Sequence, residues 1–144
     1  MISINFPPYE PRIRKEKNGS FIFDEVRKQW VSLTPEEWVR QNFLQYIIRV
    51  EYYPSSLIAV EKTISVGELK KRFDIVVYDR GSLPWMIIEC KEMNVSLSQT
   101  VMDQVMRYNI PLRAPFFVMT NGNQCVAYEY EKDQIRELSR LPSF

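Results

Sequence analysis

The stretch KRFDIVVYDRGSLPWMIIECK, from Lys71 to Lys91, decides the expected fold. It contains two apolar runs, each of a length typical of a buried β-strand, separated by the turn-forming residues DRGSLP. Gly81 and Ser82 are a favoured two-residue hairpin pair, with glycine first as a type II′ turn requires. The sequence therefore predicts an antiparallel hairpin with strands over about 72–79 and 84–91.

Acidic and basic residues interrupt these apolar runs near the open end of the hairpin. A turn centred on Gly81-Ser82 places Asp74 opposite Glu89, and opposed residues point to the same face of a sheet. We therefore expect Asp74, Glu89 and Lys91 to cluster at one end of one face. The apolar residues expected on the other face are Phe73, Ile75, Val77, Met86, Ile88 and Cys90.

Two carboxylates directly opposed across a sheet destabilise it unless something offsets their charge. A divalent cation is an economical solution, because Mg²⁺ binds through one or two carboxylates together with waters and substrate phosphates. Asp74 and Glu89 would hold the metal, and Lys91 would orient the attacking water or stabilise developing negative charge. The alternative is a hairpin edge that carries ordinary surface ion pairs.

Length and composition indicate one folded domain. The chain has 144 residues, 45% of them hydrophobic and 13% aromatic, which is enough to bury a single core. No apolar run is long enough for a membrane span, and the start shows no secretion signal. Cys90 and Cys125 give no disulfide framework, so we expect a cytoplasmic protein with no membrane association.

The residue types that are missing narrow the chemistry. The sequence has no histidine, which excludes Ser-His-Asp and Cys-His catalysis and histidine-bound zinc. Its four glycines form no phosphate-binding loop. Its 19 basic and 18 acidic residues leave little net charge for phosphate neutralisation, so contact with DNA requires a local patch, a dimer or other subunits. The groups that remain available for catalysis are carboxylates, lysines and a bound metal ion.

The other elements follow from caps and periodicity. Thr34 and Pro35 predict the start of a helix over roughly 35–50. A strand is expected over 56–66, a helix within 99–110, and two strands over 114–120 and 125–131 joined by an Asn-Gly turn. Residues 1–33 form an N-terminal arm with a short strand or hairpin, and residues 34–144 form the main domain. The expected class is α/β (α+β), with a mixed central sheet flanked by helices.

The chain resembles the PD-(D/E)xK nuclease superfamily and, more narrowly, the N-terminal nuclease domain of the restriction subunit of type I restriction enzymes. The resemblance runs from Thr34 to Tyr128 and rests on the segments TPEEWVRQ, VEKTISVGELKKRFDIVVYD, IIECKEMN, DQVMRYN and FVMTNG. It implies a restriction-endonuclease-like αβββαβ core. Asp74 matches the acidic residue of the first motif, although Phe73 replaces the proline often found there, and Glu89 and Lys91 match the second motif.

Three further residues take expected roles from the resemblance. Gln104 and Tyr108 match a Q-x-x-x-Y element that some branches of the superfamily place beside the active site. Glu37 matches a glutamate of the first helix and would be a third metal ligand. Simpler explanations remain open, since Glu37 also fits a capping box with Thr34, and Tyr108 continues an apolar helix face. Glu61 is a further acidic neighbour to consider.

The function implied is that of a Mg²⁺- or Mn²⁺-dependent endodeoxyribonuclease. Restriction subunits also carry a helicase-like motor, which these 144 residues do not contain. The resemblance therefore implies a nuclease module whose substrate is DNA. This module would be free-standing, a homodimer or bound to partner subunits. The alternative is a non-catalytic nucleic-acid-binding or scaffold module that retains the fold.

Overall fold

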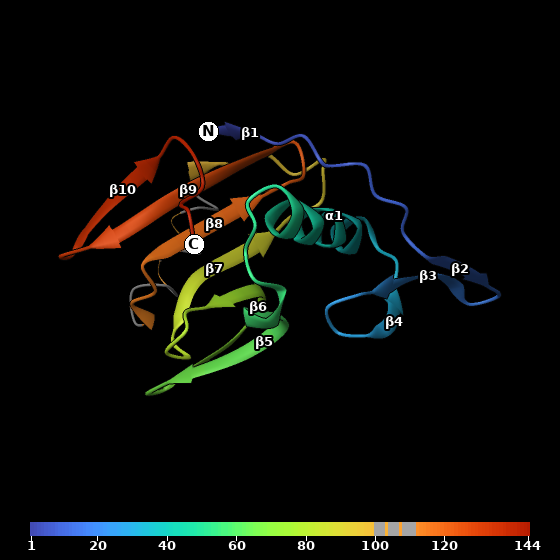
Figure 1. The fold of residues 1–144 in the computed structure, drawn as a ribbon, viewed down its shortest axis with the longest axis horizontal. Helices are drawn as coiled ribbons and strands as arrows, with labels where there is room; N and C mark the ends of the chain where they lie inside the picture. Colours follow the sequence, from blue (N-terminus) through green and yellow to red (C-terminus); the bar gives the residue numbers. More distant parts are fainter. Residues whose placement is uncertain (100–102, 104–106, 108–111) are drawn as a thin grey trace.

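The computed structural model describes residues 1–99, 103, 107 and 112–144. Within them, helix α1 spans Pro35–Arg49 and a 3₁₀ turn, η1, spans Ser55–Leu57 (Figure 1). The strands are β1 (Ile2–Ser3), β2 (Ile13–Glu16), β3 (Gly19–Asp24), β4 (Gln29–Ser32), β5 (Ile58–Val66), β6 (Leu69–Tyr78), β7 (Pro84–Cys90), β8 (Phe116–Thr120), β9 (Gln124–Glu131) and β10 (Gln134–Leu138).

The described strands form two sheets. A seven-stranded sheet has the order β1-β9-β8-β7-β6-β5, with β10 also paired to β9. β7 and β8 are parallel and the other pairs are antiparallel, so the predicted mixed sheet is confirmed. β2, β3 and β4 form a separate antiparallel sheet, which lies beyond the start of α1 and away from the large sheet (Figure 1).

Helix α1 begins where the sequence predicts. The Thr34 hydroxyl accepts a hydrogen bond from the Glu37 N–H at 3.0 Å, and Pro35 occupies the first turn. The apolar side of α1 packs on one face of the large sheet in the main core, and the helix residues buried there are Val39, Phe43, Leu44 and Ile47. The polar residues Arg40, Gln41, Asn42 and Gln45 of the helix are also buried, so a second side of α1 faces protein.

The large sheet is covered on both faces. A second core cluster contains Phe73, Val76, Ile87, Phe117, Met119 and Val126, with Leu97 and Ala114 packed over them. Burial on both faces explains the apolar run Ile75–Val77 in β6 and the run Trp85–Ile88 in β7, whereas the first residues of β6, which include Lys70 and Arg72, alternate with solvent. The helix predicted within 99–110 lies largely outside the described residues.

The hairpin between β6 and β7 has the predicted register near Asp74 but a different turn. Ser82, not Gly81, has the positive φ, at 65°, and the Asp79 N–H donates to the Leu83 carbonyl at 2.8 Å. The loop is therefore one residue longer than a type II′ turn. A register shift between Val77 and Tyr78 compensates for the extra residue, so Ile75 still pairs with Ile88.

The predicted position of Phe73 is wrong. Phe73 packs with Val76 in the second cluster, whereas Ile75 and Val77 face α1. Strict alternation breaks next to Asp74, where the neighbouring β5 residue Glu61 has a φ of 54°. Asp74 lies in the middle of this irregularity. Its side chain therefore does not follow the simple alternation between the two faces of the sheet.

The C-terminal strands agree with the prediction apart from an added hairpin. β8 and β9 meet at the predicted Asn-Gly turn, where Gly122 has a φ of 91°. β10 was not predicted. It follows a turn in which Lys132 and Asp133 have φ values of 51° and 60°, and that pair lacks the glycine that marks such turns in a sequence.

Candidate active site at the edge of the β6–β7 hairpin

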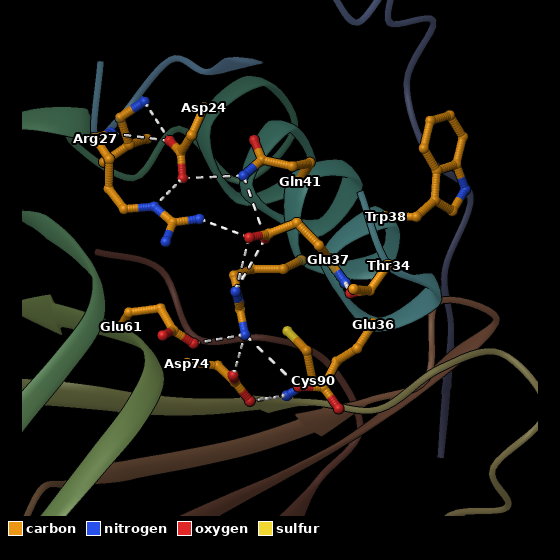
Figure 2. Close-up of polar contacts among 12 residues, drawn as sticks. Asp24, Arg27, Thr34, Glu36, Glu37, Trp38, Gln41, Glu61, Asp74 and Cys90 are labelled. Atoms are coloured by element: carbon orange, nitrogen blue, oxygen red, sulfur yellow. Dashed lines mark hydrogen bonds and ion pairs between the residues drawn. The ribbon is translucent and has the colours of Figure 1, made fainter. Parts of the chain in front are cut away.

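Asp74 occupies the irregular point of β6 and is 8% exposed. Its Oδ2 accepts a hydrogen bond from the Cys90 N–H at 2.8 Å, which ties the carboxylate to the end of β7 (Figure 2). Burial acts to raise the pKa of Asp74, but hydrogen bonds from Glu89 and Cys90, together with the Arg40 charge, hold the pKa below its usual value. Asp74 is therefore kept ionised.

Glu89 lies next to Asp74 and is 7% exposed. Its Oε1 is 3.0 Å from the Lys71 ammonium group, and its carboxyl group shares a hydrogen bond with Asp74. Burial, followed by the hydrogen bond and charge of Asp74, raises the pKa of Glu89 to about 8, against the opposite effect of Lys71. The structure thus brings the two predicted acids together as a buried carboxylate pair that holds one proton near neutral pH.

Arg40 of α1 is a site residue that the sequence reasoning missed. Its Nη2 lies 2.6 Å from Asp74 Oδ1 and 2.9 Å from Glu61 Oε1, while Nη1 lies 3.0 Å from the Glu37 carboxylate. Among the described residues, its buried Nε has no hydrogen-bond partner. The sequence feature that could have indicated Arg40 is its position three residues after Glu37 and next to the buried Val39 of the same helix.

The Glu37 carboxylate faces Arg40 and Arg27 rather than the acid pair. Arg27 Nη2 donates to Glu37 Oε1 at 2.7 Å, and Gln41 joins Glu37 to the buried Asp24. The Arg40 guanidinium lies between Glu37 and Asp74 and forms an ion pair with each. The Glu37 and Asp74 carboxylates therefore do not touch each other (Figure 2). The Thr34 hydroxyl accepts a hydrogen bond from the Glu37 N–H, as expected for the N-terminal cap that was the alternative explanation for Glu37.

Lys91 immediately follows β7. Its N–H donates to the Thr120 carbonyl at 2.8 Å, which anchors the backbone of the predicted E-x-K motif to β8. The Lys91 side chain is half-buried, and its charge acts to lower the pKa of Glu36, which burial and Asp74 raise. The Lys91 charge therefore lies on the side of the site where α1 begins. Gln104 and Tyr108 lie outside the described residues.

The acid pair suits one hard cation. Among the described side chains, no group of three or more acidic or cysteine residues is arranged to hold a metal by itself. Asp74 and Glu89 supply two adjacent carboxylates, which is the donor set that Mg²⁺ uses when waters and substrate phosphates complete its shell. A buried carboxyl pair that retains a proton is also a place where a divalent cation could replace that proton.

The family model described as "Type I restriction enzyme R protein N terminus (HSDR_N)" matches residues 35–142. The chain belongs to this family. Membership in the family of R protein N termini agrees with the resemblance in the sequence and with the restriction-endonuclease-like architecture.

Solved structures extend the comparison. A fragment of a candidate HsdR subunit of a type I restriction enzyme from Vibrio vulnificus YJ016 has 22% sequence identity and a TM-score of 0.59. The match covers 77% of this chain and 24% of that one, so the chain spans about a quarter of the length of that HsdR fragment. A candidate nuclease belonging to DUF820 from Anabaena variabilis ATCC 29413 has 11% identity and a TM-score of 0.49, over 87% of this chain and 79% of that chain. No curated protein matches the chain.

The part of the chain that the structure describes contains no helix with the length and apolar character of a membrane span.

Proposed function

We propose that this domain is a Mg²⁺-dependent nuclease that hydrolyses DNA phosphodiester bonds. The observation that carries the proposal is the buried Asp74–Glu89 pair, found at the matching motif positions in a member of the R protein N-terminal family. Two carboxyl groups held side by side inside a folded domain lower its stability unless a proton, an opposite charge or a bound cation compensates them, and buried groups with shifted pKa values are frequent at functional sites.

Each residue has a defined task in this proposal. Asp74 and Glu89 hold the cation, with Asp74 oriented by the Cys90 N–H. When bound, the metal acidifies a coordinated water and stabilises charge on a phosphoryl oxygen. Lys91 orients the attacking water or stabilises the negative charge of the transition state, and its backbone bond to Thr120 fixes its position. Gln104 and Tyr108 are proposed as supporting residues on the basis of the sequence motif alone.

Plasmid cleavage in the presence of Mg²⁺ tests the proposal. We expect the wild-type domain to nick or linearise plasmid DNA, and Lys91→Ala to reduce the rate by about 100-fold or more, since one transition-state contact contributes that much. Lys132→Asn is the matched control, because Lys132 is exposed in a distant turn and asparagine tolerates its positive φ. Cleavage by a folded Lys91→Ala protein at the wild-type rate would end the proposal.

One observation favours a second candidate, a non-catalytic scaffold. Arg40 already neutralises Asp74, so the acid pair has a permanent cationic partner without any metal. Calorimetric titration with Mn²⁺ separates the two candidates. A nuclease binds the ion and loses that binding in Asp74→Asn, whereas a scaffold gives no heat of binding with either protein.

A further inference from the structure

An exposed row of positive charge follows β2 of the three-stranded sheet, with Arg14 and Lys15 on opposite faces of the strand. Arg12, Arg14, Lys15 and Lys17 lie on or directly beside β2, all exposed, and Glu16 is the one acid among them. We call these four residues the basic strand. The whole chain is almost neutral, with 19 basic and 18 acidic residues, so this positive charge is a local feature. Local positive charge is what attracts a polyanion to a neutral protein.

Two arginines of the basic strand stack on aromatic rings. The Arg12 guanidinium lies 3.8 Å from the centre of the Phe23 ring, and that of Arg14 lies 4.7 Å from the centre of the Trp30 ring. The register pairs Phe23 with Trp30 and Arg14 with Phe21, so these side chains share one face of the sheet. Phe23 and Trp30 also make an edge-to-face contact with ring centres 5.4 Å apart.

Stacking prepares these guanidinium groups for phosphate. A guanidinium that lies flat on a ring loses rotamer freedom in advance and still presents its N–H edge, whose fork geometry matches two phosphate oxygens. Among the described residues, Arg12 makes no ion pair within 4.0 Å. Arg14 is 2.7 Å from Glu16, but both side chains are nearly half exposed, and such a pair is weak enough for a phosphate to replace.

The sheet that carries the basic strand is fixed to the candidate active site. Asp24, at the end of β3, accepts hydrogen bonds from Arg27 and from Gln41 of α1. Arg27 bonds to Glu37, and Arg40 then joins Glu37 to Asp74 (Figure 2). A continuous chain of ion pairs therefore joins Asp24 of the small sheet to Asp74 of the acid pair. Because of this connection, DNA bound to the small sheet would have a defined position relative to Asp74.

We propose that the basic strand binds the sugar–phosphate backbone of the DNA substrate. The identity of the ligand rests on the proposed nuclease function, and the location of the binding surface rests on the charge and stacking described above. Recognition is independent of base sequence, because phosphate contacts position a duplex without reading its bases. The chemistry excludes a simple apolar protein contact, since guanidinium groups cover the aromatic rings.

The test measures binding without cleavage. Fluorescence anisotropy of a labelled duplex is recorded in EDTA over a range of NaCl concentrations, for wild type, Arg12→Gln/Arg14→Gln and a control, Lys132→Asn/Arg136→Gln. The control removes the same charge from the exposed β9–β10 hairpin. We expect the arginine pair variant to bind about tenfold more weakly and the slope of log K against log salt to fall by about 2, with the control close to wild type. Arg12→Lys/Arg14→Lys should bind with intermediate affinity, because charge is kept and planar stacking is lost.

Equal DNA affinity in the arginine and control variants would overturn the proposal, as would the absence of wild-type binding at low salt. Thermal denaturation confirms that each variant is folded. The two proposals fail separately. If Lys91→Ala abolishes cleavage and the arginine variant binds like wild type, only the binding surface is wrong. If wild type binds through the basic strand but never cleaves, the binding surface stands and the nuclease activity does not.

Discussion

The guanidinium group of Arg40 lies 2.6 Å from the carboxylate of Asp74, which joins the middle of α1 to the central hairpin. Both side chains are buried, and the two residues are 34 positions apart in the sequence. The same guanidinium also forms ion pairs with Glu36, Glu37 and Glu61, so it is the shared counter-ion of four carboxylates. This contact makes Arg40 central to the stability of the site and to the balance of charge around Asp74.

Removing Arg40 should strongly destabilise the domain. Arg40→Met leaves Asp74 and Glu37 buried without compensation, which is expected to cost about 3–5 kcal/mol in the free energy of unfolding. Arg49→Met, on an exposed position of the same helix, should change it by about 0.5 kcal/mol or less. Urea denaturation measures both. A loss below about 1 kcal/mol for Arg40→Met would show that the ion pairs do not hold α1 to the hairpin.

If Asp74 holds a divalent cation as proposed, Arg40 competes with that cation for the carboxylate. Arg40→Gln keeps polar atoms on the side chain but removes the positive charge beside Asp74 Oδ1. The variant should bind Mn²⁺ about tenfold more tightly, because repulsion between the guanidinium and the ion is lost. Calorimetry on the folded variant gives the affinity directly. Weaker binding would mean instead that Arg40 is needed to orient Asp74 for the metal.

Glu89 should make stability fall as pH rises. Its pKa is raised to about 8 in the fold, so the native state keeps a proton that the unfolded chain releases near its usual pKa of 4.5. Between those values the native state binds more protons, and the free energy of unfolding should decrease by up to about 1.4 kcal/mol per pH unit. The lowered pKa of Asp74 acts only below its usual value of 3.8, outside this range.

The absence of histidine makes this measurement clean, because no histidine titrates in the same range. Urea denaturation at pH 5.5, 6.5 and 7.5 is compared for wild type and Glu89→Gln. In Glu89→Gln, the free energy of unfolding should no longer decrease with pH over this range. Parallel pH profiles for the two proteins would show that Glu89 is ionised in the native state.

Two glycines test the turn assignments. Gly122 has a φ of 91°, and an added Cβ would lie 3.2 Å from Val39 Cγ2, so Gly122→Ala should cost about 1–2 kcal/mol. Gly81 has no positive φ, and an added Cβ would meet only Asp79 Oδ1 at 3.3 Å. Gly81→Ala should therefore change the free energy of unfolding by about 0.5 kcal/mol or less. A large loss at Gly81 would support the type II′ turn that the sequence suggested.

Local sequence patterns predicted α1 and strands β5 to β9, but not β10 or the three-stranded sheet of β2, β3 and β4. The Thr34–Pro35 cap and the Asn-Gly turn work through neighbours in the chain, so the sequence alone specifies them. The β6–β7 turn was mispredicted, yet the register near Asp74 was right. Apolar residues buried on both faces of the hairpin fix the pairing, and the register shift at Val77 absorbs the extra loop residue.

The sequence by itself determined helix α1, the succession of strands β5 to β9, the buried hairpin, and the placing of Asp74 and Glu89 near its open end. These follow from short-range periodicity and turn chemistry. Only the tertiary structure decided which charges meet there. Asp24, Arg40 and Asp74 come from three separate elements, β3, α1 and β6, and the contacts that link them depend on how α1 packs on the large sheet. A charged side chain in a sequence has many candidate partners, and it is burial in the folded chain that selects among them.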